Sequence, residues 1–180
     1  MIEVIDDLFD YKFVWDTYQY FENYQHWEKL GDAFGSKVPS LGRVFDKEFG
    51  EFEPIANEYV KLLDRQDFKR CLYNAFTPQD CPKPHIDSHS PDGFTYMIYV
   101  NPDWDAGMGG ETIFIEDGEI IKSVVPKFGR LCKFTSEIWH GARPPMMDAP
   151  TRYSLVFQTH PVEPETIADL LCCLLYTSDA

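Results

Sequence analysis

The part of the chain from Lys69 onward is a series of short β-prone runs separated by turn residues, and this spacing limits the possible folds more than any other feature. Asp117-Gly118 separates two of the runs and favours a tight hairpin turn. Short, regularly punctuated strands are typical of all-β barrels and jelly rolls, so we expect a mainly β fold. The expected strands are Arg70–Phe76, Phe94–Val100, Glu111–Ile115, Glu119–Val125, Arg130–Phe134 and Arg152–Thr159.

Residues 1–66 differ from this part and are expected to be mainly helical. Over residues 13–30, aromatic and charged residues are spaced in a way that fits a helix with a broad apolar face better than a strand. Gly31 is expected to end that helix, and the stretch 32–50, which contains Gly and Pro, is expected to be a loop. A second helix is expected over residues 54–63, because its first residue is a proline, which suits a first helical turn.

The length of 180 residues fits one domain, which we expect to occupy residues 1–172. Within it, residues 1–66 are expected to form a helical support and residues 67–160 a β core. The last residues, 173–180, resemble the translation of a sequencing-adapter end. We therefore expect them to be a non-native tail without a role in the chemistry.

The chain is acidic, with 16 basic and 30 acidic residues and a formal net charge of −14. Such a charge repels phosphate backbones and anionic lipids, so neither nucleic acid nor a membrane is an expected partner. No apolar run approaches the ~20 residues that span a bilayer, and the acidic N-terminus does not resemble a secretory signal. The five cysteines contain no CxxC pair and are expected to be reduced thiols in a cytoplasmic protein. The oligomeric state is left open.

The sequence His85-Ile86-Asp87 contains the first candidate metal ligands. In an extended segment, residues two apart point to the same face, so this histidine and aspartate could meet one ion. With His140 they would form a two-His-one-carboxylate set, which leaves coordination positions open and is typical of non-haem Fe(II) oxygenases. A His-x-Asp pair alone is a weak signal, because it often arises by chance. His89 is an alternative ligand, although the Ser and Pro residues around it indicate a loop.

The last expected strand carries a second signal. Alternation places its aromatic and aliphatic side chains on one face and Arg152 and Ser154 on the other. A guanidinium inside a barrel is an unpaired buried charge unless an anion meets it, and arginine can bind a carboxylate through two hydrogen bonds. The pattern therefore predicts a bound carboxylic acid near the metal. Lys133, on another expected strand, and Arg143, in a loop, are the competing cations.

Residues 69–160 resemble the 2-oxoglutarate/Fe(II)-dependent dioxygenases, specifically their prolyl 4-hydroxylase-like branch. The order of several short motifs carries this resemblance, and no single motif is specific by itself. The N-terminal 66 residues match only in a general way, as the helical support found in this family. The motifs, in chain order, are Leu72-Tyr73-Asn74, His85-x-Asp87, Tyr99-Val100-Asn101-x-x-Trp104, Gly109-Gly110-Glu111-Thr112, His140-Gly141 and Arg152-x-Ser154.

The resemblance implies a double-stranded β-helix, the cupin-like jelly roll, with N-terminal supporting helices. It implies that His85, Asp87 and His140 hold Fe(II). It further implies that 2-oxoglutarate is the cosubstrate and O2 the oxidant, and ascorbate could serve as a reductant.

The same resemblance implies where the cosubstrate binds. The keto-acid end of 2-oxoglutarate would chelate the iron, and its distal carboxylate would meet Arg152, which we count among the catalytic residues. Tyr99 and Ser154 would add hydrogen bonds to that carboxylate. Tyr73 is a further candidate for lining the cosubstrate pocket.

Two positions depart from related enzymes. Collagen-type prolyl hydroxylases have a lysine where this chain has Arg152, so a collagen-like substrate is not implied. Relatives that demethylate nucleobases have a second arginine where this chain has Gln158. Together with the acidic charge, that difference disfavours repair of DNA or RNA.

We therefore expect an enzyme that hydroxylates a C–H bond, and the resemblance suggests a peptidyl proline or a free amino acid as the target. The main alternative is a non-enzymatic, cupin-like barrel that binds a metal for stability or sensing. A third reading is a metal-dependent isomerase or hydrolase on the same barrel. Arg152 with Tyr99 separates these readings, because a structural or hydrolytic metal site needs no carboxylate clamp.

Overall fold

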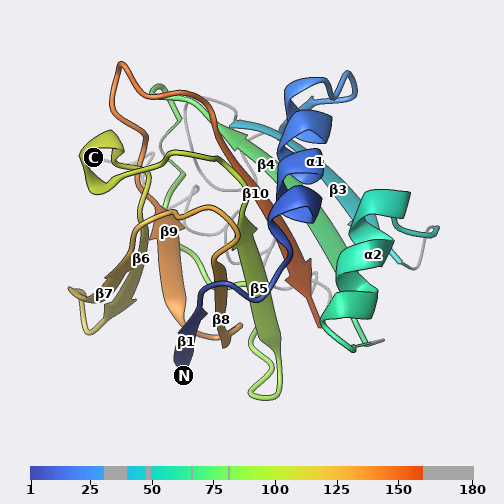
Figure 1. Cartoon of the computed structure of the whole chain (residues 1–180). Helices are drawn as coiled ribbons and strands as arrows, with labels where there is room; N and C mark the ends of the chain where they lie inside the picture. Colours follow the sequence, from blue (N-terminus) through green and yellow to red (C-terminus); the bar gives the residue numbers. More distant parts are fainter. Residues whose placement is uncertain (31–39, 48–49, 66, 81, 160–180) are drawn as a thin grey trace.

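This computed structural model describes residues 1–30, 40–47, 50–65, 67–80 and 82–159 (Figure 1). The strands are β1 (Ile2–Ile5), β2 (Glu28–Leu30), β3 (Ser40–Asp46), β4 (Arg70–Phe76), β5 (Phe94–Tyr99), β6 (Thr112–Glu116), β7 (Glu119–Val124), β8 (Leu131–Thr135), β9 (Trp139–Ala142) and β10 (Arg152–Gln158). The helices are α1 (Tyr11–Glu22), α2 (Pro54–Leu62) and the 3-10 helix η2 (Ala106–Met108). Within these described ranges, no helix combines the length and the apolar character needed to cross a membrane.

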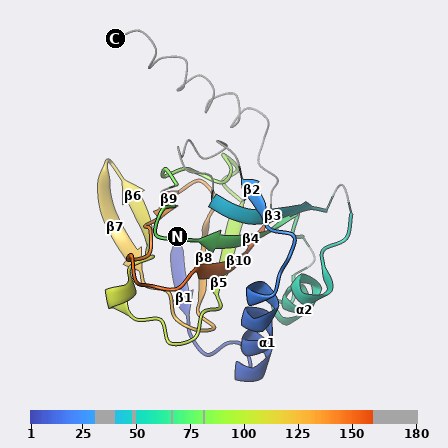
Figure 2. The same cartoon turned by 90° about the horizontal axis from the view of Figure 1, so that it is seen from above.

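The strands form two sheets. The larger, which we call the major sheet, has the order β1-β8-β5-β10-β4-β3-β2, and the smaller, the minor sheet, has the order β7-β6-β9. The strand pairings in both sheets are antiparallel. The minor sheet lies on one side of the major sheet, and α1 and α2 lie on the other (Figures 1 and 2). This arrangement confirms the expected mainly β, jelly-roll fold with flanking helices.

The six expected strands of the β core are all present, as β4, β5, β6, β7, β8 and β10. The expected hairpin turn joins β6 to β7, where Glu116 pairs with Glu119. Asp117 and Gly118 between them have φ angles of 50° and 81°. Two positive φ angles are what a two-residue type I′ turn requires, and they explain the Asp-Gly sequence.

The expectation of a mainly helical N-terminal part needs correction. Helix α1 ends at Glu22 instead of continuing to Leu30, and residues near the expected helix end form β2. Most of the expected loop 32–50 that is described forms β3, and β1 pairs with β8. These segments become strands because neighbouring strands satisfy their backbone groups, and local sequence does not reveal those partners. The expected helix end at Gly31 and the expected tail 173–180 lie outside the described residues.

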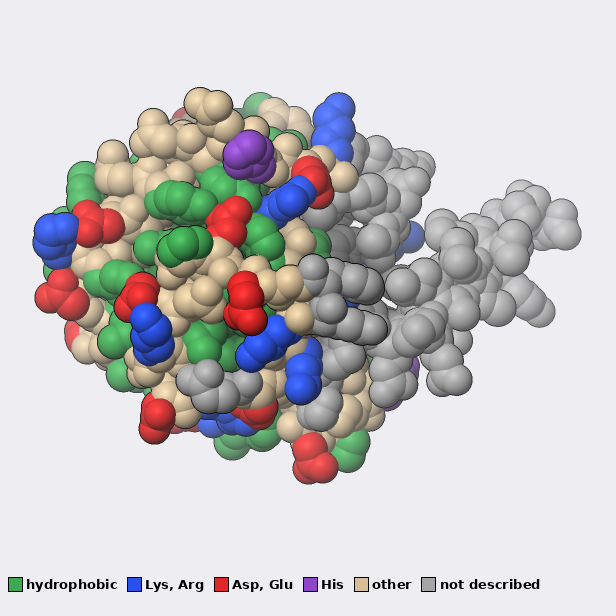
Figure 3. Space-filling view, turned by 90° about the vertical axis from the view of Figure 1, so that its right-hand side faces the viewer, with side chains coloured by type: hydrophobic (Ala, Val, Ile, Leu, Met, Phe, Trp, Pro, Cys, Tyr) green, Lys and Arg blue, Asp and Glu red, His purple; other side chains and the backbone are tan. Residues whose placement is uncertain are grey.

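Helices α1 and α2 cover the outer face of the major sheet through an aromatic core. Phe21 of α1 lies with its ring centroid 4.8 Å from that of Tyr73 and 6.0 Å from that of Tyr153. The buried hydroxyls of Thr17 in α1 and Tyr59 in α2 are 2.9 Å apart and share a hydrogen bond. Figure 3 shows acidic and basic side chains mixed with apolar ones on this side of the molecule.

The inner face of the major sheet, which faces the minor sheet, carries successive rungs of side chains. Directly paired residues of antiparallel neighbours point to the same face, and successive rungs lie two residues, or about 6.6 Å, apart. The middle rung, together with Phe134 of the first rung and Tyr99 of the last, belongs to one buried cluster with Phe114 of the minor sheet. We distinguish a first rung of Phe134, Thr95 and Gln158, a middle rung of Cys132, Met97, Val156 and Leu72, and a last rung of Tyr99, Ser154 and Asn74.

Candidate active site

Three potential metal ligands meet beside the first rung. The ligand atoms of His85, Asp87 and His140, which we call the triad, all lie within 4.8 Å of one another. Asp87 reaches toward both imidazoles, with Oδ1 3.5 Å from His85 Nε2 and Oδ2 3.7 Å from His140 Nε2. His89, the alternative ligand, is exposed and is not part of this group. The structure thus brings together the three residues that the sequence motifs indicated.

Backbone hydrogen bonds hold the two segments of the triad together. His85 and His140 form an isolated antiparallel bridge, in which each backbone N–H donates to the other residue's carbonyl, at 2.8 and 2.9 Å. The backbone N–H groups of Asp87 and Ser88 both donate to the carbonyl of Ser136. The bridge depends on β9, a strand that the sequence pattern did not predict. It explains how two segments far apart in the chain come into contact.

Both imidazoles present Nε2 to Asp87, because their Nδ1 atoms are engaged elsewhere. His85 Nδ1 lies 3.1 Å from the carbonyl oxygen of Lys83, and His140 Nδ1 lies 3.0 Å from that of Ile138. A carbonyl oxygen can only accept, so each Nδ1 carries a proton and, in the neutral ring, each Nε2 keeps its lone pair. Metal-binding histidines are usually oriented by such a hydrogen bond on the nitrogen that does not face the ion.

Burial and mutual contacts shift the pKa values of the triad. Burial opposes ionisation of Asp87, but its interactions with His140 and His85 outweigh this effect and hold its pKa below the usual range. Burial lowers the pKa of His140 to about 4. Burial also disfavours protonated His85, but the contact with Asp87 gives a net rise of its pKa. The triad therefore offers a carboxylate and a neutral His140, the protonation states that bind metal ions.

Thr95, in the first rung, orients the carboxylate of the triad. Its hydroxyl donates a hydrogen bond to Asp87 Oδ2, and both side chains are buried. Next to it in the same rung, the Phe134 ring centroid lies 4.6 Å from that of His140. No motif or pattern in the sequence indicated a role for Thr95. The signal that could have found it is the alternation along β5, which places it on the same face as Tyr99.

A buried guanidinium lies toward the opposite end of the barrel interior. Arg152 is 1% exposed and continues the inner face of β10 beyond the last rung. Its Nη1 lies 3.4 Å from Ser154 Oγ, and its Nη2 donates to Thr112 Oγ1 at 3.1 Å. Its Nε has no partner among the described residues, and burial lowers the pKa of Arg152. The hydroxyl partners are uncharged, and no carboxylate of the described residues forms an ion pair with Arg152; Glu111 acts on it only through a weaker electrostatic interaction that partly opposes the effect of burial.

Aromatic and hydroxyl side chains form the walls around Arg152. Its Cζ lies 4.9 Å from the ring centroid of Tyr99 and 5.5 Å from that of Phe76. The Tyr99 hydroxyl donates to Thr112 Oγ1 at 2.7 Å, and burial raises the pKa of Tyr99 to about 12, so it remains a neutral donor. Gly110 has a φ of 73°, and a Cβ there would lie 3.1 Å from Arg152 Cδ. Thr112 belongs to one of the family motifs, but the sequence did not indicate its contact with Arg152.

Tyr73 is not brought to this site, in contrast to the expectation from the sequence. It lies on the outer face of β4, with its ring centroid 4.8 Å from that of Phe21 and 5.6 Å from that of Tyr24. Its neighbours Leu72 and Asn74 belong to the inner rungs, so the alternation of β4 turns Tyr73 toward the helices. Burial raises its pKa, and its hydroxyl has no partner in the described part of the chain.

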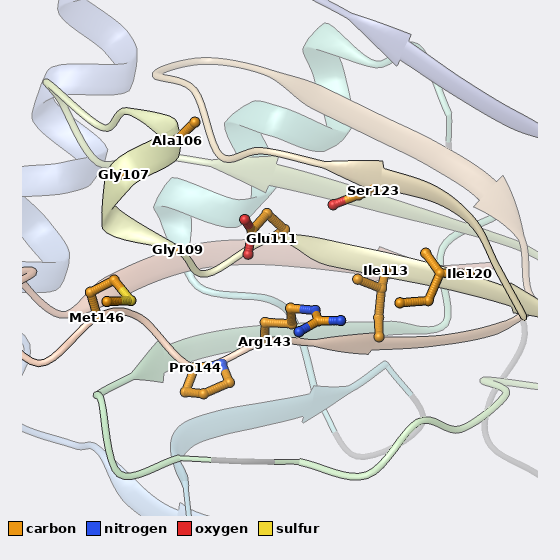
Figure 4. A pocket seen from close by; sticks show the side chains of 10 residues that line it. All are labelled: Ala106, Gly107, Gly109, Glu111, Ile113, Ile120, Ser123, Arg143, Pro144 and Met146. Atoms are coloured by element: carbon orange, nitrogen blue, oxygen red, sulfur yellow. The ribbon is translucent and has the colours of Figure 1, made fainter.

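The two competing cations also lie away from Arg152. Lys133 is on the outer face of β8, where its Nζ is 3.6 Å from Glu3 Oε2. Arg143 follows β9 and lines a surface pocket with Glu111 on the outer face of the minor sheet (Figure 4). Of the three candidates, Arg152 is therefore the one that faces the barrel interior.

Solved structures with this fold cover most of the chain. A prolyl-4-hydroxylase from Pseudomonas putida has a TM-score of 0.68 and 18% identity, with 87% of this chain and 91% of that chain covered. A prolyl hydroxylase from Trichoplax adhaerens, in complex with a hypoxia inducible factor peptide fragment, has a TM-score of 0.60 and 17% identity. The match covers 93% of this chain and 86% of that chain. The non-heme alpha ketoglutarate dependent epimerase SnoN from nogalamycin biosynthesis has a TM-score of 0.64 and 14% identity. The match covers 94% of this chain and 83% of that chain. At these identities the likeness establishes the fold alone.

A family model extends this result beyond the fold. No curated protein sequence matches the chain. Residues 71–160, half of the chain, match the model described as the 2OG-Fe(II) oxygenase superfamily. The matched span contains the triad and Arg152, and enzymes of this family use Fe(II), 2-oxoglutarate and O2. The chain therefore belongs to the 2OG-Fe(II) oxygenase superfamily.

Proposed function

We propose that this oxygenase hydroxylates a C–H bond of a peptidyl proline or a free amino acid, with the triad holding Fe(II) and Arg152 holding 2-oxoglutarate. Family membership makes the chain a dioxygenase, so the non-enzymatic metal-binding barrel is no longer the competing reading. The residue roles and the substrate class are the parts of this proposal that need a test.

The donor atoms of the triad fit Fe(II). Two imidazole nitrogens and one carboxylate are the usual protein ligands of non-haem Fe(II) oxygenases, and they leave positions for 2-oxoglutarate and O2. His85 and His140 are both oriented by carbonyl oxygens, and Asp87 is oriented by Thr95. Such outer contacts are expected where a side chain must present one atom to a metal ion.

The observation that carries the proposal is the unpaired charge of Arg152. A buried guanidinium with hydroxyl partners and an unpartnered Nε fits a ligand that supplies a carboxylate. 2-Oxoglutarate has two acidic ends, so it can meet Arg152 with one end while the keto-acid end is at the triad. A metal site with a purely structural role would not need this second charged group.

The protein's part in the reaction is to bind, orient and exclude water. Bound Fe(II) and 2-oxoglutarate supply the oxidising chemistry, in which O2 is consumed, 2-oxoglutarate becomes succinate and CO2, and one oxygen atom enters the substrate. Arg152 would fix the far end of the cosubstrate, and the Tyr99 hydroxyl lies beside it as a neutral donor. The middle rung is apolar and buried, so its side chains offer no strong hydrogen-bonding groups to hold water between Arg152 and the triad.

The proposed substrate class rests on similar structures. Two of the three similar structures described above are prolyl hydroxylases, and one of them is in complex with a peptide fragment, which supports a peptidyl proline. The similar epimerase shows that this fold also serves another outcome. The product, and not only cosubstrate consumption, must therefore be identified.

The test is succinate release from 2-oxoglutarate with Fe(II) and ascorbate, with and without proline-containing peptides and free amino acids. We expect one substrate class to stimulate succinate release and to gain one oxygen atom, detected by mass spectrometry. The matched control is Asp87→Ala under the same conditions. A product with unchanged mass and inverted stereochemistry would contradict hydroxylation. Succinate release that persists in the control would contradict the assigned iron ligands.

A further inference from the structure

Gln158 is a buried polar side chain in the barrel interior that the reaction described above does not use. It is 4% exposed, and its Oε1 has no hydrogen-bond partner among the described residues. An unpaired buried carbonyl oxygen destabilises a fold, so such a group requires an explanation.

The strand register places Gln158 next to the triad. It pairs directly with Thr95, and side chains at such paired positions have Cβ atoms roughly 5 Å apart on the same face. Thr95 donates to Asp87, and Phe134, the third side chain of the first rung, contacts His140. Two members of the first rung therefore support the triad, while the Gln158 carboxamide lies beside them with a free acceptor.

The residue on the other side of Gln158 does not use this acceptor. Arg70 pairs with Gln158 in the register of β4 and β10. Its guanidinium is engaged by Asp46, with Nε and Nη2 donating to the two carboxylate oxygens. These hydrogen bonds hold the guanidinium on Asp46, and Gln158 Oε1 stays without a partner among the described residues, so it is available to a molecule that enters the barrel.

The cosubstrate is not that molecule. Arg152 and Gln158 are six residues apart on the inner face of β10, or roughly 20 Å along the strand. 2-Oxoglutarate between Arg152 and the triad lies on the Arg152 side of the metal ligands. Gln158, in the rung that contacts the triad, is at the far end of this space. The molecule that meets Gln158 is therefore the one that is oxidised.

We propose that Gln158 positions the primary substrate by accepting a hydrogen bond from an N–H group close to the carbon that is oxidised. This inference rests on the proposed function and narrows its substrate class. Both a free amino acid, through its α-nitrogen, and a peptide, through a backbone amide, can supply the N–H group. The ring nitrogen of a peptidyl proline cannot, because it carries no hydrogen.

The test compares three probes that share the proline ring and differ in their N–H groups. They are L-proline, N-acetyl-L-prolylglycine amide and N-acetyl-L-proline dimethylamide, and the last has no N–H group. Each is titrated calorimetrically, without O2, into protein loaded with Mn(II) and 2-oxoglutarate. We expect a probe with an N–H group to bind roughly tenfold more tightly than the dimethylamide. The tighter of the first two identifies the source of the N–H group.

Gln158→Met tests the residue, because methionine has a similar length and no carboxamide. We expect this variant to bind the N–H probes and the dimethylamide within twofold of each other, with unchanged affinities for Mn(II) and 2-oxoglutarate. Gln158→Glu keeps an acceptor oxygen and is expected to keep the preference for N–H probes. Gln19→Met, an exposed substitution on α1, controls for the chemical change alone.

Several outcomes would overturn the inference. They are equal binding of all three probes by the unmodified protein, binding of none of the N–H probes, and a preference that survives in Gln158→Met. A loss of 2-oxoglutarate affinity in Gln158→Met would instead assign the residue to the cosubstrate site. Failure of the proposed function would be separate, because it would appear as Mn(II) binding that Asp87→Ala leaves unchanged.

Discussion

The two ends of the barrel interior, at Arg152 and at the triad, differ in solvent exposure. Around Arg152, the side chains of Tyr99, Thr112 and Ser154 are each at most 1% exposed, and they come from strands β5, β6 and β10 of the two sheets. At the triad, the His85 side chain is 21% exposed, and the ligands come from a loop segment and from β9. The Arg152 end, which we call the closed end, can bind the cosubstrate through a desolvated charge. The triad end, which we call the open end, can admit a substrate.

The apolar middle rung separates these two ends. Cys132, Met97 and Val156 lie between the triad and Arg152 and belong to a buried hydrophobic cluster. Effects of substitutions that share no partners usually add, so damage at one end should not spread to the other. This separation can be tested by measuring metal binding and cosubstrate binding independently.

The largest effect is expected from Asp87→Ala at the open end. The variant loses the carboxylate of the triad, so we expect turnover to be abolished and metal affinity to fall sharply. The side chain adds little to the apolar cores, so the fold should remain largely intact. Succinate release, metal titration and circular dichroism measure these three properties. Loss of folding instead of turnover would favour a structural role for the metal.

A smaller effect is expected from Arg152→Ala at the closed end. A charge-assisted hydrogen bond contributes roughly 1.5–3 kcal/mol, so 2-oxoglutarate affinity should fall about ten- to a hundredfold. Metal affinity should be nearly unchanged, because the middle rung separates the two ends. Arg152→Lys should rescue binding only in part, since lysine keeps the charge and loses the planar fork. Titration of 2-oxoglutarate into Mn(II)-loaded protein provides the measurement, and unchanged affinity in Arg152→Ala would disprove the clamp.

Thr95→Val is expected to act more mildly, and at the open end alone. Valine has nearly the same shape but cannot donate to Asp87, and outer contacts of this kind usually affect metal affinity by tenfold or more. We expect about a tenfold loss of Mn(II) affinity, recovery in Thr95→Ser, and unchanged 2-oxoglutarate affinity once metal is saturating. An equal loss of both affinities would show that the two ends are coupled.

Local sequence patterns were sufficient for parts of the site that lie on one segment. The spacing of His85 and Asp87 and the alternation of Arg152 with apolar residues in β10 are both visible within a few residues. The approach of His140 is different, because it depends on β9 and on a backbone bridge between distant segments. The two-His-one-carboxylate set and the order of motifs in a known family indicated that third residue, and no local pattern around His140 did so.

The sequence-based expectations that were wrong or incomplete also concern features that depend on contacts between distant segments. Strands β1, β2 and β3 are stabilised by pairing with distant strands, so their own sequences read as helix or loop. Tyr73 was assigned by its place in a motif, although the alternation of β4 turns it away from the inner rungs. Thr95 and Thr112 were missed because a threonine in a strand is common, and only the three-dimensional contacts single them out.

Tyr73→Phe is expected to have the smallest effect, and it tests which face of the major sheet belongs to the site. The Tyr73 hydroxyl is buried among α1 side chains without a described partner, so its removal should relieve a desolvation cost. We expect unchanged 2-oxoglutarate affinity and a free energy of unfolding that is equal or higher by up to about 1 kcal/mol.

Tyr99→Phe is the matched control for this last substitution. It removes a hydroxyl that donates to Thr112 next to Arg152, so it should weaken 2-oxoglutarate binding several-fold, because a neutral hydrogen bond contributes about 1 kcal/mol. Thermal unfolding and 2-oxoglutarate titration of both variants provide the comparison. If Tyr73→Phe lowers cosubstrate affinity and Tyr99→Phe does not, the cosubstrate pocket lies on the helix-covered face. The contrast between a closed Arg152 end and an open triad end would then no longer describe this barrel.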